Sequence, residues 1–391
     1  MDTIQVVQVY HHDPCDKGKG GVVRYINNIL KYMPRKGIKV TLFGVDTGKC
    51  QENELDTLKI SFVPIIKSSA TWWRYLIKLT FRLPFMRIPK ESVIHVHRIE
   101  YVLPFIISKR KNPVVLTLHG ERLATAKVKY QKAFPLIEAI YRILEYFIFK
   151  RANVIVAVSN KVKESFENVH KNISDKIIVL PVGVDMDEFK PLDKDYLRQK
   201  YDIGEETKVL LFAGVLEERK NIGLLIRAFR YVQERYPDSI LLIVGDGPLR
   251  SSLEKLVEEL KIKSKVWFLG EVSREQLPES YNLADVFALP SLSEGSPTVV
   301  REALACGIPV VSTDVGDVKE IITDPLLGTV VNTYTDERVF AEALIETIEN
   351  IDKNNEEIKK RCRDIARKYS FENVVEKYVE IYHKLRSGEQ R

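Results

Sequence analysis

Short apolar runs of strand length alternate with amphipathic stretches along nearly the whole chain, and no other sequence feature restricts the fold as much. The apolar runs, such as PVVLTLH at 113–119, are continuous, which is typical of parallel strands covered on both faces. The stretch 22–36 repeats apolar residues at three- and four-residue steps and predicts a helix with one buried face. This alternation predicts a parallel α/β sheet with helices on both sides.

The pattern runs through the chain twice, with a restart after a loop of Asp, Lys and Pro at 185–207. We therefore expect two doubly wound, Rossmann-like α/β domains at 1–188 and 189–368, and a helix at 369–391 that docks on the first domain. Ligands of such sheets bind beyond the carboxyl ends of the strands, so we expect the chemistry in a cleft between the domains. The expected strands are 4–10, 39–43, 92–97, 113–119, 153–159, 176–181, 208–214, 239–245, 265–270, 285–290, 308–313 and 328–332.

Composition limits the class of protein. With 45% hydrophobic and 29% charged residues among 391, the chain can form large buried cores. No apolar run is long enough to span a bilayer, and the opening MDTIQVVQVY lacks the basic flank and cleavage site of a secretory signal. The cysteines have no zinc spacing, so we expect free thiols in a reducing compartment, and hence a cytoplasmic protein. They are Cys15, Cys50, Cys306 and Cys362.

Charge is distributed unevenly between the two halves. Residues 1–185 carry a formal net charge of +14 and residues 186–391 carry −8, which gives +6 for the whole chain. A basic first half indicates an anionic partner, such as a lipid surface or a phosphorylated lipid. Nucleic acid is not expected as a partner, because the chain has no motif that reads it.

Two segments have residues suited to a phosphate group. KGKGG at 17–21 is expected to open a helix, where free N–H groups favour an anion; a tight turn without a ligand is the alternative. In GVLEERKN at 214–221, Arg219 and Lys220 lie at a strand end and suit a diphosphate; a solvated pair balanced by nearby glutamates is the alternative.

A third segment, SEGSPTVVREALACGIPVV at 293–311, has Glu294 in a loop and Glu302 on the helix that follows. Pro297 is expected in the first helical turn. Small residues before a helix form an amide site for anions, and carboxylates accept hydrogen bonds from sugar hydroxyls. Two ordinary surface glutamates are the alternative.

Together these segments resemble the signature of the family-four retaining glycosyltransferases, whose GT-B fold has two Rossmann-like domains facing across a cleft. The Glu-x7-Glu spacing of EGSPTVVREALACGIPVVST carries the resemblance, and further motifs follow in the family's order over nearly the whole chain. These are GGVVRYINNIL, HVH, TLHGE, VIVAVSN, LPVGVDMDEF, LLIVGDGPL and ADVFALPS. The resemblance implies a retaining, metal-independent hexosyltransferase that uses a UDP- or GDP-linked sugar and needs no cofactor.

The resemblance also implies roles for individual residues. Glycines of the first loop would approach the diphosphate or the sugar, the basic pair would neutralise the diphosphate, and Glu302 would hold the ribose. The implied donor-binding residues are Gly20, Gly21, Arg219, Lys220, Leu269, Val272, Glu294, Gly295, Ser296, Thr298, Val299 and Glu302. The implied catalytic residues are His119, Glu294 and Lys220.

One departure from the family's pattern bears on the donor site. Most relatives have Arg after the glycine that ends the 208–214 strand, whereas this chain has Val215, so donor affinity or donor type can differ.

His95 and His97 share one face of a strand, as metal ligands can. With His119 at a neighbouring strand end, a three-histidine metal site is conceivable. No fourth ligand is evident and the family has histidines here without a metal, so no metal is expected.

The acceptor side is indicated by WWRYLIKLTFRLPFMRI at 72–88, whose basic residues recur every four positions among aromatic ones. This pattern is typical of a helix on an anionic membrane surface; a core helix with a solvated basic stripe is the alternative. The similar run 134–151 leads into a core strand and is expected to be buried. The residues expected at the membrane or acceptor are Trp72, Trp73, Arg74, Lys78 and Arg82.

The sequence therefore favours transfer of a hexose to a lipid-linked or glycan acceptor in the synthesis of a cell-surface glycan or glycolipid. The protein is expected in the cytoplasm, peripheral on the inner face of the membrane. One alternative is a sugar-nucleotide epimerase, which shares the two-domain architecture. Another is a non-catalytic subunit that binds nucleotide-sugars, which Val215 suggests.

Overall fold

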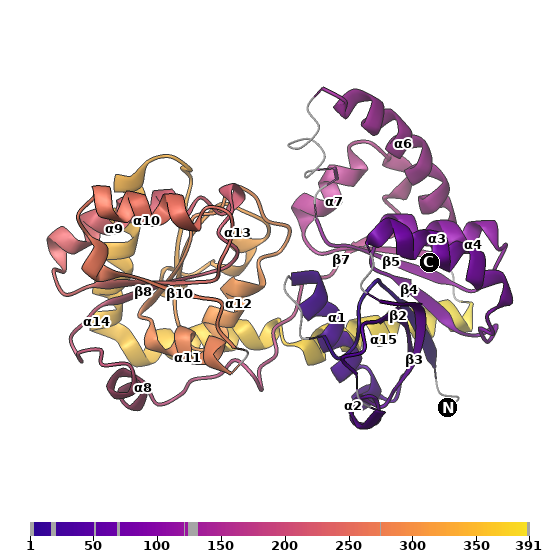
Figure 1. The fold of residues 1–391 in the computed structure, drawn as a ribbon, viewed down its shortest axis with the longest axis horizontal. Helices are drawn as coiled ribbons and strands as arrows, with labels where there is room; N and C mark the ends of the chain where they lie inside the picture. Colours follow the sequence, from indigo (N-terminus) through magenta and orange to yellow (C-terminus); the bar gives the residue numbers. More distant parts are fainter. Residues whose placement is uncertain are drawn as a thin grey trace. The chain divides into compact units, whose positions relative to one another are not determined.

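The computed structural model describes residues 4–16, 21–50, 52–68, 71–120, 122–123, 132–273 and 275–388. The chain divides into two compact units, each a parallel α/β structure of the predicted Rossmann-like class (Figure 1). Unit 1 comprises Met1–Val182 and Phe371–Arg391, and unit 2 comprises Gly183–Ser370. No helix in the described part of the chain is long and apolar enough to cross a bilayer.

Unit 1 contains a seven-stranded parallel sheet in the order β3-β2-β1-β4-β5-β6-β7. The sequence pattern predicts six of these strands and misses β3, at the edge of the sheet. Most side chains of β3 are only partly buried and Pro64 interrupts it, so the segment lacks the apolar run of an interior strand. The strands are β1 (Gln5–Val9), β2 (Lys39–Asp46), β3 (Ile60–Lys67), β4 (Val93–Val96), β5 (Val114–Leu118), β6 (Val154–Ala157) and β7 (Ile177–Val179).

Helices cover both faces of this sheet because the strand order reverses direction at β1. One face carries α1 (Gly21–Tyr32), α2 (Glu52–Leu58) and the C-terminal α15 (Phe371–Ser387) (Figure 1). The other carries α3 (Trp72–Arg82), α4 (Leu103–Ile107), α6 (Phe134–Arg151) and α7 (Asn160–Glu167). Single 3-10 turns lie at Pro34–Lys36, Leu83–Phe85, Ile99–Val102 and Lys171–Ile173.

Unit 2 has a six-stranded parallel sheet in the order β10-β9-β8-β11-β12-β13. Successive residues of its central strand point to opposite faces: Leu211 packs in one hydrophobic core and Leu210 in the other. The strands are β8 (Val209–Ala213), β9 (Ile240–Val244), β10 (Val266–Gly270), β11 (Val286–Leu289), β12 (Val310–Thr313) and β13 (Gly328–Val331).

The helices of unit 2 include a long α14, in which Asn354 has non-helical dihedral angles and marks a kink. The helices are α8 (Lys194–Lys200), α9 (Ile222–Arg235), α10 (Arg250–Glu259), α11 (Gln276–Leu283), α12 (Thr298–Ala305), α13 (Val318–Ile321) and α14 (Glu337–Lys368). The 3-10 turns are Glu218–Lys220, Lys263–Lys265 and Pro325–Leu327.

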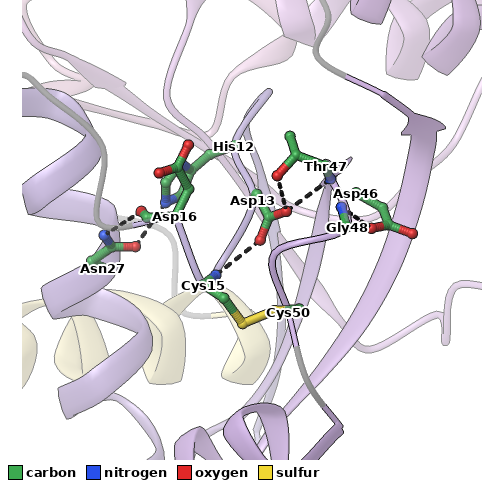
Figure 2. Close-up of a disulfide and its surroundings, with 9 residues drawn as sticks. All are labelled: His12, Asp13, Cys15, Asp16, Asn27, Asp46, Thr47, Gly48 and Cys50. Atoms are coloured by element: carbon green, nitrogen blue, oxygen red, sulfur yellow. Dashed lines mark hydrogen bonds between the residues drawn. A yellow bond between two sulfur atoms is a disulfide. The ribbon is translucent and has the colours of Figure 1, made fainter.

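Two of the four cysteines form a disulfide, so the expectation of four free thiols is wrong (Figure 2). Cys15 and Cys50 follow β1 and β2, which are neighbours in the parallel sheet. Parallel neighbours end at the same edge, which brings together loops that are 35 residues apart. Beside the disulfide, the Asp13 carboxylate accepts hydrogen bonds from the Cys15 amide at 3.0 Å and the Thr47 hydroxyl at 2.6 Å.

Helix α6 is not the buried helix that its sequence suggests. Only three of its residues are buried, and Leu136, Ile140, Ile143 and Phe147 are between 49% and 66% exposed. The buried side of α6 includes a charged residue, Glu145, which pairs with Arg122 and His170. The helix is attached to unit 1 partly through this ionic contact, and its apolar stripe faces outward.

Candidate functional site

The loops that follow β8 and β9 in unit 2 pack backbone against backbone. A Cβ atom on Gly245 would lie 2.0 Å from the Gly214 carbonyl oxygen, and one on Gly247 would lie 2.5 Å from that of Leu216. Only glycine permits such an approach, and Gly245 has a positive φ of 119°. The motif GDGPL therefore has a steric role: it fixes the loop on which the basic pair lies.

The basic pair after β8 meets a carboxylate from the loop after β11. The Lys220 ammonium lies 2.5 Å from Oε1 of Glu294, and Nη1 of Arg219 lies 2.8 Å from Oε2. The Ser291 hydroxyl donates to Glu294 at 2.8 Å, and Arg219 also pairs with Glu217 at 2.7 Å. Glu294 lies 74 and 75 positions after Lys220 and Arg219 in sequence, and the three residues form one cluster at the carboxyl edge of the sheet.

Two members of this cluster, Glu294 and Arg219, are stabilised in their charged forms. Burial acts to raise the pKa of Glu294, but Lys220 and Arg219 outweigh it and hold the pKa below its usual range. Burial likewise acts against the Arg219 charge, whereas Glu294 and Glu217 raise its pKa. Only 11% of the Lys220 side chain is exposed, against 46% for Arg219. Arg219 is therefore the more accessible of the two cations.

Helix α12 carries the second glutamate of the predicted pair. Glu302 is buried, and the Tyr281 hydroxyl donates to its Oε2 at 2.8 Å. Pro297 precedes the helix as its N-cap and is not in the first turn as predicted. The half-buried residues around this helix start are Gly295, Ser296, Thr298 and Val299.

The expected base-binding segment spans the end of strand β10 of the same sheet and the loop after it. Leu269 is in β10 and 39% exposed, whereas Val272 packs partly against the hydrophobic core. Because β8, β9, β10 and β11 are parallel, the loops after them share one edge. Val215 is 46% exposed at this edge and adds no charge.

In unit 1, the expected catalytic histidine lines a cavity at the carboxyl ends of β4 and β5. The cavity has a volume of about 210 Å³, and His97, His119 and Gly120 are among its lining residues. Gly21 begins α1, and a Cβ atom there would meet nothing within 4 Å, so this structure does not require glycine at that position. Gly20 lies outside the described residues.

Buried polar residues that the sequence did not single out surround these histidines. Nδ1 of His95 lies 2.6 Å from the Tyr382 hydroxyl, and Nε2 lies 2.8 Å from that of Thr117. The Tyr25 hydroxyl donates to that of Tyr378 at 2.6 Å. The two tyrosines of α15 thus join the histidine cluster. A polar residue within an apolar strand, such as Thr117, is the sequence signal for such a cluster.

The surface of unit 1 formed by α3, α4 and α6 exposes large apolar side chains beside basic ones, and we call it the basic–apolar surface. Helix α4 packs against both α3 and α6, so the three are contiguous. Helix α3 buries Tyr75 and Leu79 and exposes basic residues on its other side. The exposed apolar residues are Trp73, Ile77, Phe81, Phe85, Ile107, Leu136, Ile140, Ile143 and Phe147.

Two residues expected at the membrane also have contacts within the protein. Trp72 is half-buried, with the Arg98 guanidinium 4.3 Å from the centre of its ring. Arg82 donates to the carbonyls of Pro64 and Ile65 at 2.7 and 2.9 Å, which satisfies acceptors near the edge strand β3. Arg74 and Lys78 are exposed and have the expected orientation toward solvent.

Two Rossmann-like units in one chain, the second with a basic pair and a carboxylate at the carboxyl edge of its sheet, define a two-domain α/β protein of the GT-B class. Residues 193–369 match the family model "Glycosyl transferases group 1", and residues 19–188 match "Glycosyltransferase Family 4". The chain therefore belongs to the family-four glycosyltransferases, as its motifs predicted.

Individual relatives support this assignment along the whole length. An uncharacterized glycosyltransferase of Methanocaldococcus jannaschii is 26% identical, over 93% of this chain and 94% of its own. The UDP-Gal:alpha-D-GlcNAc-diphosphoundecaprenol alpha-1,3-galactosyltransferase of Escherichia coli is 25% identical, over 93% of each chain. Among solved structures, HepE of Anabaena in complex with UDP and glucose has a TM-score of 0.76 at 18% identity, covering 97% of this chain and 100% of that one.

Proposed function

We propose that this protein transfers a hexosyl unit, with retention of anomeric configuration and without a metal, from a UDP- or GDP-linked sugar to a lipid-linked or glycan acceptor. The observation that carries the proposal is the cluster of Arg219, Lys220 and Glu294 beside the glycine-packed loops of unit 2. It supplies two cations where parallel sheets bind phosphorylated ligands. The solved HepE complex with UDP and glucose supports a nucleotide-sugar donor.

The chemistry is departure of a nucleoside diphosphate from an anomeric carbon. Negative charge grows on the diphosphate in the transition state, and fixed cations stabilise it more than the ground state. Lys220 is held by a nearly buried carboxylate and cannot turn away, whereas the more exposed Arg219 can reorient toward a phosphate. These cations do the work of a divalent metal, since no Asp-x-Asp motif lies at a strand end of unit 2.

Around this cluster the remaining residues hold the donor. Glu302, oriented by the Tyr281 hydroxyl, accepts hydrogen bonds from the ribose hydroxyls. The backbone N–H groups of Gly295, Ser296, Thr298 and Val299 contact the sugar and the phosphate at the start of α12. Leu269 and Val272 cover one side of the base, and Glu294 lies beside the transferred sugar. As the resemblance implies, Gly20 and Gly21 are assigned to the diphosphate or the transferred sugar, and His119 is assigned to a sugar.

The basic–apolar surface of unit 1 supports a lipid-linked acceptor and peripheral binding to the inner face of the cell membrane. Residues 57–90 contain seven basic residues and no acidic one, and α3 lies within this range. On α6 the exposed charged residues, Arg142 and Lys150, are also basic, and the partly exposed Glu138 is paired with Arg122. Exposed aromatic and aliphatic side chains beside basic residues fit an anionic bilayer. The E. coli relative acts on a diphosphoundecaprenol-linked sugar, which agrees with such an acceptor.

The donor is tested by thermal unfolding of the purified chain with UDP, GDP and ADP and with their sugars. A ligand at a hundred times its dissociation constant stabilises the folded state by about 2.7 kcal/mol, which is an observable shift in Tm. We expect one base to stabilise the protein and the other two to have little effect. No shift with any nucleotide contradicts the proposal.

A second assay separates transfer from the competing activities. With the selected nucleotide-sugar and an undecaprenyl-diphosphate sugar, we expect a product whose new linkage keeps the donor's anomeric configuration, also in the presence of EDTA. A new nucleotide-sugar without acceptor would identify an epimerase. Binding without transfer or hydrolysis would identify a non-catalytic subunit, for which Val215 is the favouring residue.

A further inference from the structure

The histidine cluster of unit 1 has a hydrogen-bond order that fixes how His119 faces its cavity. Gln8 lies in the middle of β1, and its amide nitrogen is 3.3 Å from the Met33 sulfur. A thioether sulfur only accepts hydrogen bonds, so the NH₂ group of Gln8 must point toward Met33. The amide oxygen therefore points to His97, whose Nε2 lies 2.7 Å away.

An amide oxygen only accepts, so Nε2 of His97 carries a proton. Burial, together with the neighbouring His95 and His119, holds the pKa of His97 well below its usual value, so the ring is neutral at pH 7. A neutral imidazole has one N–H, which leaves Nδ1 of His97 as an acceptor. This nitrogen lies 3.3 Å from Nε2 of His119, which must then be the donor.

The same reasoning applies to His119 itself. Burial lowers its pKa to about 3, so its ring is also neutral and its only proton is on Nε2. Nδ1 of His119 is consequently an unprotonated acceptor, and no residue in the described part of unit 1 forms a hydrogen bond with it. His119 is half-buried and lines the 210 Å³ cavity.

The other charged groups around this cavity are paired. Nε of Arg98 lies 3.0 Å from the Glu100 carboxylate. Oε2 of Glu145 lies 2.8 Å from Nε of Arg122 and 2.7 Å from Nε2 of His170. The cavity therefore has no unpaired cation among the described residues that line it. An ionised phosphate oxygen only accepts hydrogen bonds, and so does Nδ1 of His119. The two atoms would repel each other, so the cavity does not favour a phosphate at this position.

We propose that Gln8 and His97 are positioning residues that hold His119 as the Nε2–H tautomer, so that its Nδ1 accepts a hydrogen bond from a sugar hydroxyl and not from a phosphate. The inference deepens the proposed transferase function and rests on it for the identity of the ligand as a sugar. The tautomer itself does not depend on that function.

The tautomer is read directly by long-range ¹H–¹⁵N correlation spectra of protein labelled with ¹⁵N-histidine, with His119→Gln to assign the resonances. At pH 7 we expect the pattern of a neutral Nε2–H ring for both His97 and His119. In Gln8→Met, which is similar in size but has no acceptor oxygen, we expect His119 to shift toward a mixture of tautomers. Gln5→Met, on the same strand and away from the histidines, should leave the spectrum unchanged. An Nδ1–H or doubly protonated His119 in the wild type overturns the proposal.

The hydroxyl is identified with single deoxy analogues of the donor and acceptor sugars. Loss of one neutral hydrogen bond is expected to lower kcat/KM about tenfold, which corresponds to about 1.4 kcal/mol. For one deoxy analogue we expect kcat/KM in the wild type to be about tenfold lower than for the parent sugar. In His119→Gln, the same analogue and the parent sugar should have equal kcat/KM. If every analogue responds equally in both proteins, the hydroxyl contact is wrong even where the tautomer is right. An inactive protein with the expected spectrum contradicts the proposed function and leaves the positioning role of Gln8 and His97 intact.

Discussion

The ammonium group of Lys220 lies 2.5 Å from the Glu294 carboxylate, although the two residues are 74 positions apart in sequence. Both side chains are about one-tenth exposed, so neither charge is well hydrated. In the proposed diphosphate site, this ion pair holds the lysine side chain in place before the donor arrives.

Lys220→Met is expected to lower kcat/KM by a hundredfold or more and to destabilise the protein by about 1–3 kcal/mol. The substitution removes a cation from the proposed leaving group and leaves the nearly buried Glu294 with Arg219 as its cationic partner. Initial rates and urea unfolding measure the two effects. Lys200→Met is the matched control, because Lys200 forms a more exposed pair with Glu279 at 2.7 Å and should change neither quantity by much. Equal behaviour of the two variants would contradict the role of Lys220.

Tyr281→Phe is expected to weaken nucleotide binding about fivefold with little change in kcat. The hydroxyl of Tyr281 is one of the groups that orient the Glu302 carboxylate, and a hydrogen bond to a charged group contributes about 1.5–3 kcal/mol, part of which water can replace. Glu302→Ala should weaken binding further. Calorimetric titration with the nucleotide measures both. Tyr196→Phe, at an exposed tyrosine of α8, is the control. A fall in kcat without a change in affinity would assign Glu302 to the reaction itself.

Much of the fold follows from the sequence, because interior strands of parallel sheets are continuous apolar runs. Each of the twelve expected runs overlaps a strand, and the missed strand, β3, is the one whose residues are mostly half-exposed. Helix α6 shows the limit of hydrophobicity as a guide to burial. Its composition matches a core helix, yet its outward stripe is apolar and its inward side includes Glu145. Composition alone does not tell which side of a helix meets the sheet.

The site is harder to predict than the fold, since its contacts join residues far apart in sequence. The resemblance named Arg219, Lys220 and Glu294, but their ion pairs became apparent only from the loops at one sheet edge. Cys15 and Cys50 have no motif spacing, and only the pairing of β1 with β2 brings them together. Gln8 is one of two polar residues in the otherwise apolar strand β1, and its role depends on which of its atoms face Met33 and His97.

Stability is expected to fall steeply as the pH is lowered from about 6.5 toward 4. Burial lowers the pKa of His95 to about 3 and that of His119 to about 3, whereas both have their ordinary values near 6.5 in the unfolded chain. Between these values the unfolded state binds more protons, so each histidine contributes stability that is present above pH 6.5 and is lost toward the folded pKa. The loss is at most about 1.4 kcal/mol per pH unit for each histidine. Urea unfolding at several pH values measures the slope, which should decrease in His95→Gln. An unchanged slope in that variant would show that His95 does not stay neutral.

Reduction of the disulfide is expected to lower the stability of unit 1 by about 3–4 kcal/mol in the chain-entropy model, because the bond closes a loop between positions 35 residues apart. Cys15→Ser with Cys50→Ser should have the same Tm as the reduced wild type and should not respond to a reductant. Alkylation followed by mass spectrometry counts the free thiols. Cys306→Ala with Cys362→Ala, which removes the two buried free cysteines, should retain the response. Four reactive thiols in the unfolded, unreduced protein would contradict the disulfide.

Membrane binding is expected to depend on both the charged and the apolar parts of the basic–apolar surface. Arg74→Glu with Lys78→Glu should reduce sedimentation with vesicles containing an anionic lipid by tenfold or more, since each basic residue near such a surface contributes about 1 kcal/mol. Ile140→Ser with Ile143→Ser should reduce binding even at high salt, because these exposed side chains of α6 act through apolar contact and not through charge. Lys353→Glu with Lys360→Glu, at exposed positions of α14 in unit 2, is the charge-matched control. If the α3 and α6 variants both bind vesicles as the wild type does, this surface has no membrane role. If only the α3 variant loses binding, that role is restricted to one helix.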